Sequence, residues 1–328
     1  MYYLRTRFSS CEGNGWRVLL VLSLLLLPRS ARSGADSLGP LEVGDALKRF
    51  HLSPDLVIEA VASEPLVTDP VAIAFDERGR LYVVEYRDYP LGPGEGKPPL
   101  SRIKRLEDTD GDGRMDQVTL FADGLSFAQG LLPWNRGLVV TAAPEVLFLK
   151  DTDDDGKADV REVLYRGFTP GNPQLRVAHP RLGLDNWIYV TNGLSNGEVT
   201  SDSVPGASVP LQGHDFRFHP ATRAFEPATG FGQFGNTFDD WGNRFFCSNR
   251  NPTMVSILPY AAMVRNPYAL IGKGYEDVAD FGGDAKVYPI VPTATTAFEH
   301  TGTHTAACGV TVHRESPGSR LQWMRLRL

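Results

Sequence analysis

Apolar and polar residues alternate in short blocks along most of the chain, and one kind of block recurs. It comprises an apolar strand, a tight polar turn and a second strand that is rich in aromatic and β-branched residues. The turns begin at Asp76, Trp134, Asp185 and Asp239. They are spaced by roughly 50 residues, a period typical of a propeller in which each repeat forms one four-stranded blade.

The repeats predict an all-β propeller with about five blades present. The paired strands are expected at 70–75 with 81–84, 130–132 with 138–140, 181–184 with 187–190, and 236–238 with 244–247. A frayed fifth repeat begins at 306–310. A β-sandwich, in which turns recur every 8–12 residues or so without the longer period, is the alternative fold.

The first 35 residues have the order of a secretory signal peptide. Arg5, Arg7 and Arg17 precede the apolar run 18–27, and small residues follow as far as Ala35. An apolar run of about ten residues is short for a membrane span. We therefore expect an exported protein that is periplasmic or otherwise extracytoplasmic. Membrane association through an uncleaved anchor is the alternative.

The rest of the chain divides into three parts. Residues 36–55 form a lead-in with a short helix at 42–50, and the propeller domain occupies 56–313. The tail 314–328 is aberrant, because it is basic and has no blade pattern. We expect from this tail that the sequence is a truncated or frame-altered reading of a longer protein.

Composition and charge narrow the possible partners. The formal net charge is −6, and no basic stripe interleaved with aromatic residues is present, so nucleic acid is not an expected partner. Cys11 lies in the signal, which leaves Cys247 and Cys308 as one disulfide or as two buried free thiols. The chain contains no CxxCH haem-attachment motif.

Two acidic loops, at 108–116 and 151–159, share aspartates at positions 1, 3, 5 and 9 and glycine at position 6. Closely spaced carboxylates suit Ca²⁺, a hard cation with oxygen ligands, and glycine permits the sharp turn that gathers them. We predict calcium sites with the ligands Asp108, Asp110, Asp112 and Asp116 in the first loop and Asp151, Asp153, Asp155 and Asp159 in the second.

Position 12 distinguishes the two loops. It is Glu162 in the second loop, which matches the bidentate ligand of an EF-hand, and Thr119 in the first. The flanking segments read as strands, so both loops are expected to close β-hairpins. The alternative is that they are solvated Asp/Gly turns that bind no ion.

A set of polar residues lies about six positions before each turn, just ahead of the innermost strand. The set comprises Asp69, Gln129, His179 and Gln233. Equivalent positions around one axis predict a ligand site at one mouth of the central channel. The alternative is that these side chains cap strands by bonding to neighbouring backbone.

A second candidate for metal binding is the pair His300 and His304. A spacing of four residues brings two imidazoles together on a helix. The glycine and threonines around them favour a loop instead, so a metal role is not the expected one.

Four segments together resemble a known family: 62–67, 108–113, 235–247 and 249–252. They are similar to the N-terminal propeller of exported bacterial membrane-bound dehydrogenase domain proteins, which in turn resemble the soluble glucose and sorbosone dehydrogenases. The resemblance covers roughly residues 41–312. It implies a six-bladed propeller with pyrroloquinoline quinone (PQQ) and calcium, acting on a sugar or alcohol. A c-type cytochrome or haem domain is the implied electron acceptor.

The resemblance also suggests roles for individual residues. In a quinoprotein, a general base accepts the alcohol proton, and His179 is the candidate because it lies at the channel mouth. Cations hold the quinone carboxylates. The candidate cofactor-binding residues are Arg176, Arg181, Arg250, Gln129, Gln233 and Asn236. The catalytic calcium is left without clear ligands.

Three functions therefore compete. The first is an exported PQQ- and calcium-dependent sugar or alcohol dehydrogenase. The second is a non-catalytic, calcium-stabilised propeller that binds carbohydrate or protein. The third is an inactive fragment of a longer haem-c-containing protein.

Overall fold

The strand-forming runs of the sequence become antiparallel sheets in the computed structural model, which describes residues 2–6, 39, 41–54, 56–269, 271–278, 280, 282–288 and 302–314. The helices of this described part are short. They are α1 (Val43–Leu47), α2 (Tyr260–Val264) and the 3₁₀ turn η1 (Gly282–Asp284). The predicted all-β, propeller-type fold is thus confirmed.

Four sheets, here called blades 1 to 4, follow one another along the chain. Blade 1 comprises β3 (Pro70–Phe75), β4 (Leu81–Glu85), β5 (Ser101–Glu107) and β6 (Gln117–Leu125). Blade 2 contains β7 (Ala128–Trp134), β8 (Gly137–Ala142), β9 (Glu145–Lys150) and β10 (Val160–Arg166). Blade 3 comprises β11 (Ala178–Leu182), β12 (Ile188–Thr191), β15 (Asp215–Phe218) and β16 (Phe225–Ala228). Blade 4 comprises β17 (Asn236–Phe238), β18 (Arg244–Phe246), β19 (Met254–Ser256) and β20 (Tyr275–Asp277).

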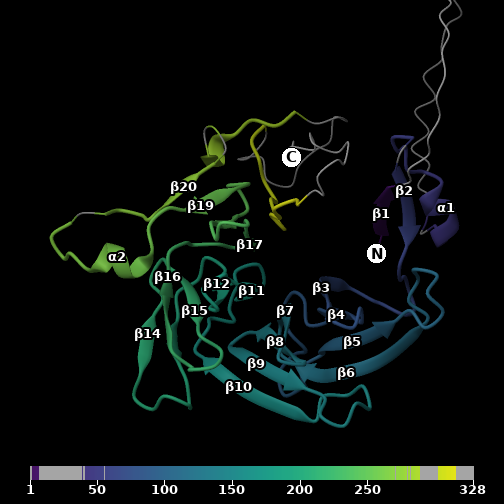
Figure 1. The fold of residues 1–328 in the computed structure, drawn as a ribbon, viewed down its shortest axis with the longest axis horizontal. Coiled ribbons are helices and arrows are strands. Elements are labelled where there is room, and N and C mark those ends of the chain that lie inside the picture. Colours follow the sequence, from purple (N-terminus) through teal and green to yellow (C-terminus); the bar gives the residue numbers. More distant parts are fainter. Residues whose placement is uncertain are drawn as a thin grey trace, which may run out of the picture.

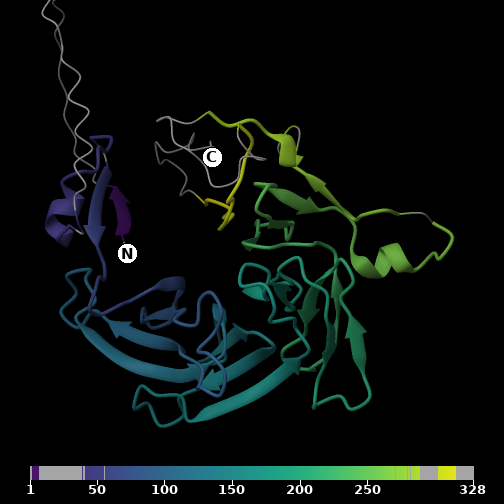
Figure 2. The ribbon, with the colours of Figure 1, turned by 180° about the vertical axis from the view of Figure 1, so that it is seen from behind.

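The blades form an arc in chain order, with their first strands on its inner side (Figures 1 and 2). The inner strand β7 contacts β3 on one side and β11 on the other, and β11 contacts β17. Sequence analysis predicted about five blades, whereas four sheets of this kind are present in the described residues. No strand forms at 306–310 within the described segment 302–314.

A hairpin from blade 3 extends blade 2. Strands β13 (Glu198–Thr200) and β14 (Ser208–Pro210) lie in the connection between β12 and β15, yet β13 pairs with β10. Blade 2 therefore has six strands, in the order β14-β13-β10-β9-β8-β7. The hairpin ties two neighbouring blades together by backbone hydrogen bonds.

A separate two-stranded sheet precedes blade 1. It pairs β1 (Tyr2–Thr6) with β2 (Leu56–Ala60) in antiparallel register. Strand β1 falls within the predicted signal peptide, whose apolar run at 18–27 lies outside the described residues. No helix in the described part is long and apolar enough to cross a membrane.

The hydrophobic core lies between blades, because alternate residues of each strand face opposite neighbours. Tyr82 and Val84 of blade 1 pack with Leu131 and Val140 of blade 2. A second cluster joins blades 2 and 3 and is rich in aromatic residues. There Tyr165 lies edge-on to Phe216, with ring centroids 5.1 Å apart.

A buried ion pair joins blades 3 and 4. Asp215 and Arg244 have side chains that are 0% and 4% exposed, and Oδ2 of Asp215 is 2.7 Å from Nη2 of Arg244. The guanidinium also donates to Asn236 Oδ1 at 2.8 Å and to the Thr229 carbonyl at 2.8 Å. Backbone N–H of Asn192 donates to the Asp215 carboxylate at 2.9 Å. Both charged side chains therefore have hydrogen-bond partners at the interface between blades 3 and 4.

We expect Asp215→Ala to lower the free energy of unfolding by about 3–5 kcal/mol, because it leaves the Arg244 guanidinium buried and uncompensated. Urea denaturation measures the change. Asp45→Ala is the matched control, since Asp45 pairs with Lys48 at 2.9 Å on the exposed surface, where such a pair contributes about 0–1 kcal/mol. Equal losses in the two variants would show that the buried pair is not a major source of stability.

Candidate functional site

In each blade, one residue with a left-handed backbone lies just before the inner strand or near its start. Asp69, Phe127 and Gly235 stand directly before β3, β7 and β17, with φ of 46°, 47° and 101°. His179, near the start of β11, has φ of 52°. This conformation is uncommon for residues other than glycine. The repeated turn brings equivalent segments of four blades to one mouth of the arc.

A pocket of about 540 Å³ lies at this mouth. It is lined by residues of blades 1, 2 and 3 and of the connections between blades, among them Asp69, Tyr86, Gln129, Gln174, His179 and Phe234. Three of the four predicted channel-mouth residues therefore share one pocket. The fourth, Gln233, does not line the pocket, although the adjacent residue Phe234 does.

Aromatic side chains that sequence analysis did not identify form part of the pocket wall. Tyr86 and Tyr89 line it, with ring centroids 5.8 Å apart and an edge-on arrangement. The Tyr86 hydroxyl accepts a hydrogen bond from Arg176, while burial raises the pKa of this tyrosine. No periodic pattern marks these two residues, because they lie beyond the end of β4.

Three of the residues predicted to bind a cofactor donate hydrogen bonds to the backbone of the loop 169–177, which leads into β11. Gln129 donates to the Pro173 carbonyl at 2.9 Å, and Gln233 donates to the Gln174 carbonyl at 3.1 Å. Arg176 is 2% exposed and donates to the Pro170 carbonyl at 2.7 Å. The alternative that the channel-mouth side chains bond to neighbouring backbone thus describes Gln129 and Gln233, although Gln129 still lines the pocket.

The remaining predicted cofactor-binding residues also bond to backbone. Asn236 donates to the carbonyls of His179 and Tyr189 at 3.1 and 3.0 Å. Arg181 donates to the Pro180 carbonyl at 3.1 Å, and burial lowers the pKa of its guanidinium. Arg250 donates to the Gly283 carbonyl at 3.2 Å. None of these three side chains lines the pocket.

The pocket does not fit the quinone that the family resemblance implies. PQQ carries several carboxylates, which proteins hold with arginine or lysine. Among the described lining residues the only such cation is Arg87, and the carboxylate of Asp69 lies in the same wall. A polyanion would meet one arginine together with an opposing negative charge.

His179 lines this pocket as a neutral imidazole. Burial, followed by the positive charge of Arg181, lowers the pKa of His179 to about 4. A general base is most effective when its pKa lies near the working pH. His179 lies in the pocket at the channel mouth, as the sequence predicts. Its lowered pKa, however, makes it a weak base.

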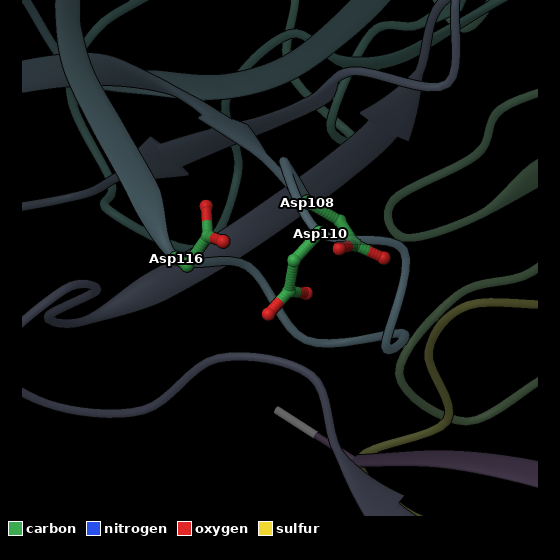
Figure 3. A group of neighbouring side chains, drawn as sticks. All are labelled: Asp108, Asp110 and Asp116. Atoms are coloured by element: carbon green, nitrogen blue, oxygen red, sulfur yellow. The ribbon is translucent and has the colours of Figure 1, made fainter.

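The two acidic loops close the β5–β6 and β9–β10 hairpins, as the sequence predicts. Figure 3 shows Asp108 and Asp110 at the start of the first loop and Asp116 at its end. One carboxylate oxygen from each lies within 4.8 Å of the others. Backbone N–H groups of Gly113 and Gly111 hold the pKa of Asp108 below its ordinary value. The three hard oxygen donors fit a Ca²⁺ ion.

The other carboxylates of the first loop complete its turn. Asp112 accepts the backbone N–H of Arg114 at 2.8 Å, and Asp116 accepts the Thr109 hydroxyl at 2.8 Å. The second loop repeats these bonds, from Lys157 N–H to Asp155 at 2.8 Å and from Thr152 to Asp159. In that loop the clustered carboxylates are Asp151, Asp153 and Asp155.

The second loop differs in having arginine partners from blade 1. Arg105 lies 3.4 Å from Asp151, and Arg78 lies 3.4 Å from Asp154. The expected position-12 ligand, Glu162, instead receives two hydrogen bonds from Arg223, at 2.9 and 3.0 Å. The sequence favours the second loop as the more complete calcium site, whereas the structure leaves the first loop less neutralised by neighbouring cations.

The last described segment contains two residues singled out from the sequence. His304 forms a backbone bond from its N–H to the Ala285 carbonyl at 2.9 Å, while His300 lies outside the described residues. Cys308 is exposed and Cys247 is buried, and both thiols are free in this structure. The expectation that the histidine pair has no metal role is not tested, because one of its members lies outside the described residues.

Two solved structures are distantly similar to part of this chain. The luciferin-regenerating enzyme is 10% identical with a TM-score of 0.36, covering 60% of this chain and 57% of that chain. The PQQ domain of pyranose dehydrogenase from Coprinopsis cinerea is 15% identical with a TM-score of 0.37, covering 70% of this chain and 53% of that chain. The chain thus spans somewhat more than half the length of these structures, and such a distant likeness says nothing of activity.

A comparison with curated proteins found no match. The resemblance to membrane-bound dehydrogenase domain proteins therefore stays a prediction. Residues 42–322 match the model of a family described as a domain of unknown function, DUF7133. Because this match covers most of the chain, the protein belongs to the DUF7133 family.

Proposed function

We propose that the protein is an exported, calcium-stabilised propeller that binds a neutral carbohydrate in the pocket at the mouth of its blades. The observation that carries this proposal is the lining of that pocket. It combines exposed aromatic surface with uncharged polar groups and a single carboxylate, and it offers one arginine only among the described residues.

The chemistry of the wall suits a sugar. Tyr86, Tyr89 and Phe234 line the pocket, and Tyr89, at 54% exposed, offers the aromatic surface against which the C–H groups of a sugar ring would pack. Asp69 and Gln174 offer polar groups for hydroxyls. The volume of about 540 Å³ is within the range of roughly 300–1,000 Å³ that is usual for small-molecule sites.

Calcium has a structural role in this proposal. The first acidic loop connects β5 to β6, and none of its residues lines the pocket. An ion that bridges Asp108, Asp110 and Asp116 would remove the repulsion between their carboxylates and stabilise the turn. Such an ion would act on folding stability and would not take part in ligand chemistry.

Quinone-dependent oxidation of a sugar or alcohol is the competing function. It would make His179 the proton acceptor and a haem partner the electron acceptor. It also needs cations that hold the cofactor carboxylates, and the three arginines predicted for that purpose bond to backbone carbonyls. Carbohydrate binding without oxidation therefore has the better support.

We expect neutral mono- and disaccharides to bind the full chain more tightly than gluconate and glucose 6-phosphate, which serve as anionic controls. Binding of PQQ is measured in a separate experiment. Isothermal titration calorimetry measures binding. Tyr89→Ala should weaken binding about tenfold, because it removes an exposed stacking surface of the pocket. Tyr268→Ala, at another exposed tyrosine, is the matched control. Tight PQQ binding followed by dye reduction with a sugar would instead establish the dehydrogenase.

We expect Ca²⁺ to raise the melting temperature of the protein, because an ion that binds only the folded state stabilises it by mass action. In Asp110→Asn, about tenfold more Ca²⁺ should be needed for the same rise in melting temperature. The substitution removes one negative charge from the loop but keeps an oxygen that accepts the Asp112 N–H. Asp153→Asn is the matched change in the second loop and should have little effect. Differential scanning fluorimetry across a calcium titration, with a chelator as the starting point, decides the matter. Loss of the effect in Asp153→Asn alone would place the ion in the second loop.

A further inference from the structure

The two ring nitrogens of His179 have different surroundings. Nδ1 is enclosed by protein and has no hydrogen-bond partner among the described residues. The residue nevertheless lines the pocket and is only partly covered. Nε2 is not among the enclosed atoms that lack a partner, and it makes no hydrogen bond to the described residues, so it is the ring nitrogen that remains accessible from the pocket.

This difference selects a tautomer. A neutral imidazole has one N–H donor and one acceptor nitrogen. An enclosed N–H without an acceptor is rarer in proteins than an acceptor that is not fully used. The proton is therefore better placed on Nε2, where water or a ligand accepts its hydrogen bond. A second proton is disfavoured, since burial and the neighbouring Arg181 both oppose a charged ring.

We propose that His179 recognises the ligand as a neutral hydrogen-bond donor, through Nε2–H, and is thus a specificity-determining residue of the pocket. This inference rests on the proposed function, in which the pocket holds a carbohydrate. Sequence analysis assigned His179 as a base that accepts a proton from the substrate, whereas here it donates a hydrogen bond to the ligand. A base would need its lone pair on the pocket side.

The backbone of His179 is fixed in a way that suits this role. Its left-handed conformation, with φ of 52°, is held by the Asn236 side chain, which donates to the His179 carbonyl at 3.1 Å. Asn236 is in turn bound to Arg244 at 2.8 Å. The backbone of His179 is therefore hydrogen-bonded to the same buried network that joins blades 3 and 4.

Asp69 supplies the complementary group. It comes from blade 1, lines the same pocket and offers a carboxylate, which accepts hydrogen bonds. A hydroxyl group both donates and accepts, so a polyol can satisfy Asp69 and His179 together. An anionic ligand meets the charge of Asp69, and an ether has no hydrogen to donate to it. The pair therefore selects neutral ligands with free hydroxyl groups.

The tautomer is measured directly by two-bond ¹H–¹⁵N correlation spectra of the full chain labelled at histidine nitrogens. The sequence contains seven histidines, and the His179 signals are identified by their loss in His179→Gln. We expect the pattern of an Nε2–H tautomer at neutral pH without ligand. A pattern with hydrogen on Nδ1, or on both nitrogens, would overturn the inference.

Two variants test recognition. His179→Gln places an amide N–H close to the position of Nε2, whereas His179→Asn places it close to that of Nδ1. With the same panel of neutral sugars, we expect the glutamine variant to bind within about threefold of the wild type and the asparagine variant about tenfold more weakly. Equal losses in both variants would contradict donation from Nε2. Melting temperatures report whether each variant is folded.

The two proposals fail in different ways. If no sugar binds the wild type, carbohydrate binding is wrong, and the spectrum of the free protein still decides the tautomer. If sugars bind but His179 carries its hydrogen on Nδ1, the proposed function stands and the role of His179 does not.

Discussion

The pocket depends on a backbone constraint that is repeated in each blade, the left-handed residue at the entrance to the inner strand. Gly235 adopts this conformation without strain, whereas at Asp69 and His179 it costs about 1–3 kcal/mol each. Such strain persists only where the surroundings fix it. The Tyr86 N–H donates to the Asp69 carbonyl at 3.1 Å, and Asn236 holds the carbonyl of His179. Asp69 and His179, the left-handed residues of blades 1 and 3, both line the pocket.

The location of the pocket could be predicted from the sequence, but the hydrogen-bond partners of its residues could not. Hairpin turns are local signals, so the period and the channel-mouth positions could be found without a structure. The partners of Gln129 and Gln233 are carbonyls 44 and 59 residues away, on one loop. A glutamine amide bonds equally well to a ligand or to a backbone carbonyl. Sequence spacing therefore cannot separate ligand contact from loop support, and Tyr86 and Tyr89 follow no repeat pattern at all.

The acidic loops show the same limit in their electrostatics. Their local hydrogen bonds are nearly identical, because the same residues occupy the same positions and local geometry follows local sequence. Their difference comes from blade 1, which places Arg105 beside Asp151, and from blade 3, which places Arg223 on Glu162. A protein cation that neutralises a carboxylate reduces the gain from binding a metal there. The completeness of a loop motif therefore does not reveal which of its carboxylates are already paired with arginines of neighbouring blades.

Contacts between adjacent blades also explain how a site can exist on an arc of sheets. Aromatic packing and the β13–β14 hairpin join blades 2 and 3, while the Asp215–Arg244 pair joins blades 3 and 4. In repeat architectures, stability is approximately a sum of such nearest-neighbour terms. The pocket draws its groups from blades that are already held by these contacts. Its geometry is therefore set by the contacts between neighbouring blades.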